Sequence, residues 1–86
     1  MENETMIKVL LLSTNEYVIS EIVAVYAELG DPNCKLINPY KIDGDKLVSW
    51  IGDYTDQTEV MISSEKILTL VDPNEKYLTM YQEVIQ

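Results

Sequence analysis

The side chains best suited to catalysis are few, and they do not combine into a reactive set. Cys34 stands beside Lys35, whose charge favours a thiolate, but the chain contains no histidine to serve as a base. Without histidine there is no Cys–His pair, no Ser-His-Asp triad and no ordinary zinc site. We therefore expect a protein that is not an enzyme, with Cys34 acting as a small strand residue.

Carboxylates are the other candidate ligands. The segment Asp43-Gly44-Asp45, together with Asp53 and Asp56, carries the oxygen ligands that hard divalent cations prefer. Their spacing matches no EF-hand loop, so solvated loops are the expected interpretation. The sequence predicts no metal site and no cofactor.

The charge balance limits the partners. Fifteen acidic residues face six basic ones, all lysine, and the net charge is −9. Without arginine the chain lacks the planar fork that grips phosphate or guanine from two sides. A charge of this sign repels polyanions unless the lysines gather on one face. DNA binding is not expected.

The size of the chain predicts one domain, spanning residues 1–86. A chain of this length buries about 60–65% of its unfolded surface, which makes it a candidate for oligomerisation. Its longest apolar runs are too short to cross a membrane, and its acidic N-terminal residues do not resemble a signal peptide. The lone cysteine excludes an internal disulfide and fits a reducing cytoplasm.

Residues 10–30, LLLSTNEYVISEIVAVYAELG, allow two interpretations. At helical spacing, Val18, Ile22, Val25 and Leu29 form one stripe, and Gly30 would end a helix over 14–29. Such a helix would indicate a βα-type nucleotide or small-molecule-binding domain. The many β-branched residues instead favour a strand that follows a turn at 14–16, and this is the interpretation we prefer.

The rest of the chain reads mostly as short strands separated by turn residues. Pro39 belongs at an edge or a bulge, and the Asp43–Asp45 segment is typical of a hairpin turn. Several strands at intervals of 8–12 residues indicate a small barrel or sandwich. The strands are expected at 6–12, 17–29, 34–42, 47–51, 59–62 and 66–71.

A helix is expected at the C-terminal end, over residues 73–85. Asp72 suits the N-cap, Pro73 the first helical position, and Glu75 the acid of a capping box. One face of this helix is apolar and must cover the barrel or a neighbouring subunit. That face consists of Tyr77, Leu78, Tyr81, Val84 and Ile85.

The spacing of the first hairpin resembles that of the Sm-like proteins, the small bent barrels that include Sm, LSm and bacterial Hfq proteins. Leu12, Asn15, Val18, Ser20 and Ile22 occupy the positions of the first Sm motif, with Asn15 and Ser20 in place of glycines. Asn tolerates the left-handed backbone that the turn requires. Ser20 stands where the second Sm strand bends sharply.

Further segments extend the resemblance. The second Sm motif is similar to residues 61–67, MISSEKI. The whole chain is most similar to small Sm-like proteins of marine cyanophage type. Their outline matches Leu36-Ile37-Asn38-Pro39, Leu47-Val48-Ser49-Trp50 and Asp72-Pro73…Tyr81.

This resemblance implies a mainly β fold: a strongly bent, five-stranded Sm-like or SH3-like barrel with a C-terminal helix. It also implies a homo-oligomeric ring of five to seven copies, acting as a phage-type binding or assembly scaffold in the cytoplasm of a bacterial or phage-infected cell. Exposed strand edges give a physical reason for such assembly. The implied interface residues are Glu59, Val60, Met61, Ile62, Ile67, Leu68 and Leu70.

RNA binding of the LSm type is the alternative function that the resemblance implies. The family contacts RNA through an Asn of the third loop and an Arg-Gly of the second motif. Asn33, Ser63 and Ser64 stand at these positions, so the principal cation is missing. A ring of five would carry five times −9, or −45 charges, which disfavours RNA.

Overall fold

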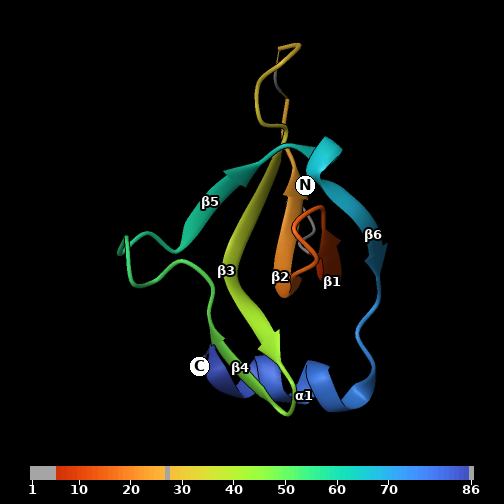
Figure 1. Ribbon diagram of the computed structural model, residues 1–86, viewed down its shortest axis with the longest axis vertical. Helices are drawn as coiled ribbons and strands as arrows, with labels where there is room; N and C mark the ends of the chain where they lie inside the picture. Colours follow the sequence, from red (N-terminus) through yellow and green to blue (C-terminus); the bar gives the residue numbers. More distant parts are fainter. Residues whose placement is uncertain (1–5, 27, 86) are drawn as a thin grey trace, which may run out of the picture.

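The protein is described by a computed structural model covering residues 6–26 and 28–85 (Figure 1). It is mainly β, with one antiparallel six-stranded sheet and one C-terminal helix. A short 3₁₀ turn, η1 (Ser64–Lys66), connects the last two strands. The elements are β1 (Met6–Leu12), β2 (Tyr17–Ala24), β3 (Cys34–Asp43), β4 (Lys46–Ser49), β5 (Glu59–Ile62), β6 (Ile67–Val71) and α1 (Glu75–Val84).

The sheet has six strands but only five lanes, where a lane is one strand position across the sheet. Its order is β4-β3-β2-β1-β6, and β5 also pairs with β3. β5 runs along Cys34–Ile37, whereas β4 runs along Tyr40–Asp43, so the two short strands lie end to end beside β3. The five-stranded barrel that the resemblance implied is therefore corrected to a sheet of six strands, the number of strand segments expected from the sequence pattern. The loop of residues 50–58 divides the outer lane into β4 and β5. Within the described ranges no pairing joins β5 to β6, and the sheet is not a closed barrel.

The disputed segment after Leu12 is a strand. β2 pairs with β1 from Tyr17 to Ile22, and Asn15 takes a positive φ of 68° in the connecting turn. The strand prediction is thus confirmed, although β2 ends at Ala24 instead of residue 29. Gly30, with φ of 92°, lies in the following loop and does not end a helix. The β-branched residues outweighed the helical stripe because packing against β1 and β3 rewards them.

A β-bulge interrupts the pairing of β2 with β3. Ile19 lies opposite Tyr40 and Glu21 opposite Ile37, so Ser20 faces two residues, Asn38 and Pro39. The extra residue bends the strand, and Asn38 takes a positive φ of 55°. The prediction that Pro39 sits at a bulge is confirmed. Pro39 also lies between the part of β3 that pairs with β5 and the part that pairs with β4.

One hydrophobic cluster packs against the curved sheet, and Ile19 and Tyr81 are also fully buried outside this cluster. The buried members of the cluster are Leu10, Leu12, Val18 and Leu36. Burying a side chain of this kind contributes about 1.5–3 kcal/mol. Residues of both outer lanes complete the core, so β5 and β6 are held by their inward side chains. The partly buried residues packed against the core are Ile22, Trp50, Val60, Ile62 and Ile67.

The C-terminal helix begins later than expected. Its N-cap is Asn74, whose side-chain oxygen accepts a hydrogen bond from the Tyr77 N–H at 3.0 Å. Asp72 is not the cap, because it directly follows β6 and its carboxylate pairs with Lys8 of β1. Pro73 precedes the cap. Figure 1 shows α1 lying across the end of the sheet beside β4, and no helix among the described residues is long and apolar enough to span a membrane.

Candidate functional site

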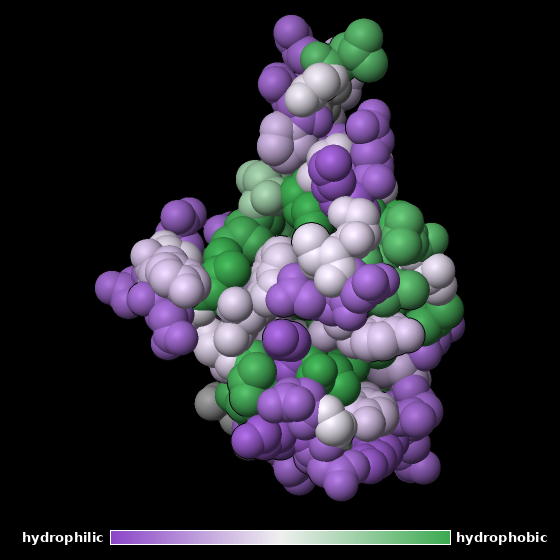
Figure 2. All heavy atoms as spheres, viewed as in Figure 1, coloured by the Kyte–Doolittle hydropathy of each residue, from purple (hydrophilic) through white to green (hydrophobic). Residues whose placement is uncertain are grey.

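The two outer lanes of the sheet are the first candidate surface. In the described part of the chain, β5 pairs only with β3 and β6 only with β1, so each has one free backbone edge. Apolar side chains accompany these edges: Met61 on β5 is 48% exposed, and Leu68 on β6 is 59% exposed. Figure 2 shows apolar surface on both flanks of the molecule, over β5 and over β6. An edge with this composition is suited to pairing with another chain.

The predicted interface residues divide into two groups. Met61, Leu68 and Leu70 are exposed, whereas Val60, Ile62 and Ile67 pack against the protein's own core. Glu59 is exposed at the start of β5, where its carboxylate lies 3.5 Å from the Lys35 ammonium. Val71 is also 48% exposed on β6, and the sequence did not single it out. Strand alternation within 67–71 does not predict which side chains are exposed, because the β1–β6 register shifts between Leu11 and Leu12.

The three candidate RNA-binding residues lie where the loop before β3 contacts the η1 turn. The Ser64 N–H donates to the side-chain oxygen of Asn33 at 2.8 Å, and the Asn33 amide nitrogen donates to the Ser64 hydroxyl at 3.0 Å. Ser63 caps η1 by accepting a hydrogen bond from the Glu65 N–H. The structure therefore brings together residues about thirty positions apart.

These residues line a hollow of about 290 Å³. Its wall includes the carboxylates of Glu28, Asp31 and Glu65, and none of the described lining residues is basic. A phosphate entering this hollow would face negative charge. The Asn33 amide also uses one donor and one acceptor in its hydrogen bonds with Ser64, so fewer of its groups can form hydrogen bonds with an RNA base.

The loop of residues 50–58 carries two aromatic residues in different surroundings. Trp50 packs against the core, whereas Tyr54 is 89% exposed. Cys34 is half-buried, and burial raises the pKa of its thiol. Lys35 does not lower the pKa of Cys34, because its ammonium lies near Glu59 instead. Among residues 6–26 and 28–85, no group of three His, Cys, Asp or Glu side chains is arranged to hold a metal ion.

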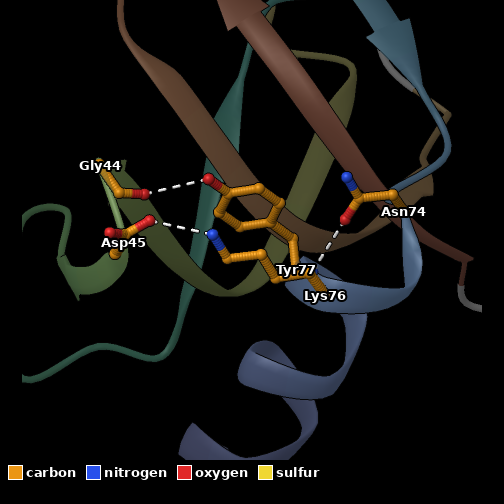
Figure 3. A network of polar contacts seen from close by, with 5 residues as sticks. All are labelled: Gly44, Asp45, Asn74, Lys76 and Tyr77. Carbon is orange, nitrogen blue, oxygen red and sulfur yellow. Dashed lines mark hydrogen bonds and ion pairs between the residues drawn. The ribbon is translucent and has the colours of Figure 1, made fainter.

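Contacts between α1 and the β3–β4 turn fix the start of the helix (Figure 3). The Tyr77 hydroxyl donates to the Gly44 carbonyl at 3.0 Å, and the Lys76 ammonium lies 2.9 Å from the Asp45 carboxylate. This hydrogen-bonded pair lowers the pKa of Asp45 and raises the pKa of Lys76. The turn is the predicted hairpin, with Gly44 and Asp45 between paired Asp43 and Lys46.

Tyr81 of α1 is fully buried, as is Ser20 of β2. The Tyr81 hydroxyl accepts a hydrogen bond from the Glu21 N–H at 3.1 Å and lies 2.9 Å from the carbonyls of both Ile37 and Asn38. Burial raises the pKa of Tyr81 to about 12. From its helical spacing, Tyr81 was expected only to pack on the apolar face of the helix. The available signal was that a buried tyrosine hydroxyl needs a hydrogen-bond partner.

These features define a small antiparallel β domain with two free edges and an acidic hollow between loops. The chain belongs to the family of unknown function DUF6561, whose model matches residues 5–86. A comparison with curated proteins finds no match.

Proposed function

We propose that the protein is a non-enzymatic subunit of a homo-oligomeric ring that serves as a binding or assembly scaffold. The observation that carries this proposal is that β5 and β6 lie in the two outer lanes of one five-lane sheet, each with a free backbone edge among the described residues. β4 shares the outer lane of β5. Pairing β5 of one copy with β6 of the next would satisfy both edges. It would also cover Met61, Leu68 and Leu70, which are exposed in the single chain.

Pairing of β5 with β6 would give a ring and not a symmetric dimer. β5 and β6 are different strands, so a contact between them is head-to-tail and leaves one free edge on each end of the pair. Head-to-tail contacts end only when the chain of copies closes on itself. A ring of five to seven copies is what the Sm-like resemblance implies.

The proposed finer fold is an Sm-like barrel completed between neighbouring copies. Its support is local: Asn15 has the positive φ of the first-motif turn, and Ser20 faces the bulge where the second strand was expected to bend. The main departure from the Sm-like pattern is that residues 50–58 divide the outer lane beside β3 into two strands, β4 and β5. A phage-type scaffold in a bacterial or phage-infected cytoplasm remains part of the proposal.

RNA binding of the LSm type is the second candidate function. The contact between Asn33 and Ser64 favours it, because the positions that the family uses are adjacent here. The acidic wall of the hollow and the net charge of −9 oppose it. The βα-type nucleotide-binding alternative required a helix over 14–29, and β2 removes that premise.

A charge placed on the β6 edge tests the ring proposal. Leu68→Lys should yield a smaller species in light scattering at equal protein concentration, because a lysine at the seam opposes burial. Leu29→Lys is the matched control, since Leu29 is fully exposed on a loop outside both edges. Equal masses for the wild type and both variants would contradict the proposal. Circular dichroism should show the same strand content in all three proteins.

A further inference from the structure

We infer that Tyr81 is a positioning residue for β5: its hydroxyl holds the β3 bulge in the shape that β5 needs to pair, and so supports assembly through β5. This inference rests on the proposed function for its last step only. It begins with contacts between α1, β2 and β3 that exist within one chain.

The bulge is the place where β3 most needs support from outside the sheet. Pro39 has no N–H to donate, and Asn38 adopts a positive φ, which is uncommon for a residue with a side chain. The regular β2–β3 ladder is therefore broken opposite Ser20. Without partners from outside the sheet, the backbone N–H and C=O groups at the bulge would be buried without hydrogen bonds, which is unfavourable.

Tyr81 supplies the missing partners. Its oxygen accepts the Glu21 N–H, and its single proton is shared between the carbonyls of Ile37 and Asn38. The Ser20 hydroxyl adds a contact of 3.0 Å to the Ile37 carbonyl. One side chain from α1 thus joins both strands across the bulge. The ring of Tyr81 also packs edge-on against Tyr40, with centroids 6.2 Å apart.

The bulge in turn holds the beginning of β5. The Asn38 N–H donates to the Thr58 carbonyl at 2.7 Å, directly before β5 starts at Glu59. The next rung pairs Ile37 with Glu59. The Asn38 residue therefore contacts Tyr81 through its carbonyl and Thr58 through its N–H. Because β5 has only four residues, this first rung is a large part of what fixes its position.

The test compares Tyr81→Phe with Tyr77→Phe. Both remove one tyrosine hydroxyl from α1, but the Tyr77 hydroxyl contacts Gly44 in the β3–β4 turn and not the bulge. Hydrogen exchange is measured for the amides of 58–62 and, as a reference, for those of β1, which does not contact the Tyr81 hydroxyl. In Tyr81→Phe we expect exchange at 58–62 to accelerate about tenfold or more relative to the reference, since the Ile37 and Asn38 carbonyls lose their donor and the bulge that anchors Thr58 loosens. Tyr77→Phe should leave that ratio unchanged.

Self-association is the second readout, by light scattering over a concentration series. Tyr81→Phe should need about tenfold more protein than Tyr77→Phe to reach the same degree of assembly. Equal acceleration throughout the sheet, or none, would overturn the inference. If the wild type is monomeric at every concentration, the ring proposal fails, and the exchange ratio still decides the role of Tyr81.

A second variant covers the case in which Tyr81→Phe does not fold. Asn38→Ala keeps the Tyr81 hydroxyl but disfavours the positive φ at the bulge. It should accelerate exchange at 58–62 relative to β1 in the same way. Unchanged relative exchange in Asn38→Ala would overturn the link between the bulge and β5.

Discussion

The side chain of Asn33 forms two hydrogen bonds with Ser64, accepting from its backbone N–H at 2.8 Å and donating to its hydroxyl at 3.0 Å. The contact connects the loop before β3 with η1, the turn between β5 and β6. It therefore holds together the two loops that flank the acidic hollow, and it places η1 at a fixed distance from β3.

Asn33→Ala should lower the free energy of unfolding by about 1–2 kcal/mol, because two hydrogen bonds are lost and the Ser64 N–H loses its partner. Asn33→Asp keeps the acceptor, loses the donor and adds a negative charge beside Glu28, Asp31 and Glu65. Its destabilising effect should be smaller at high salt, where this repulsion is screened. Urea unfolding measures both. An Asn33→Ala protein as stable as the wild type would show that the contact does not contribute to the free energy of unfolding.

The wild type should show no salt-sensitive RNA binding at micromolar protein, because the hollow is lined by Glu28, Asp31 and Glu65. The double variant Ser63→Arg, Ser64→Gly restores the residue types of the family motif and should bind more tightly at low salt. Gel shifts with U-rich and A-rich RNA at two salt concentrations provide the measurement. Tight, salt-sensitive binding by the wild type would favour the LSm-type alternative.

Asn74→Ala should cost about 1 kcal/mol of stability, the usual effect of removing a helix N-cap. Asp72→Ala should cost less, because its carboxylate is mostly exposed and makes a surface ion pair with Lys8. Thermal unfolding of the two variants, followed by circular dichroism, compares them. A larger loss of stability in Asp72→Ala than in Asn74→Ala would indicate that Asp72 is the N-cap.

Stability should fall steeply between pH 10 and pH 12. Burial raises the pKa of Tyr81 from its ordinary value near 10 to about 12, so the folded state retains this proton more strongly than the unfolded chain. The resulting stabilisation is complete below pH 10 and is lost as the pH rises toward 12. Lysines also lose charge in this range, so Tyr81→Phe is the reference. Urea unfolding should give a steeper decline for the wild type, and parallel curves would contradict the account.

Local sequence signals predicted much of the fold. The β-branched run from Val18 to Val23 indicated a strand, Asn15 a left-handed turn and Pro39 a bulge, and all three are present. Each signal depends on the residue's own backbone preference. Such preferences act within a few positions, so they can be read without knowing the tertiary structure.

Tertiary contacts explain what the sequence did not show. Asp72 and Asn74 are both good caps, and in the structure Asn74 caps the helix while Asp72 follows β6 and pairs with Lys8. The role of Tyr81 depends on backbone groups of Glu21, Ile37 and Asn38, which are distant in the chain. The proximity of Asn33 to Ser64 was implied by the family resemblance, not by any local pattern.

The central claim is that the free edges of β5 and β6 pair between copies and close a ring. Native mass spectrometry of the full-length protein, recovered together with anything it carries, tests this claim most directly. The account predicts one closed species of five to seven copies, and a smaller species for Leu68→Lys but not for Leu29→Lys. A monomer at every concentration, or a dimer that Leu68→Lys leaves intact, would contradict it.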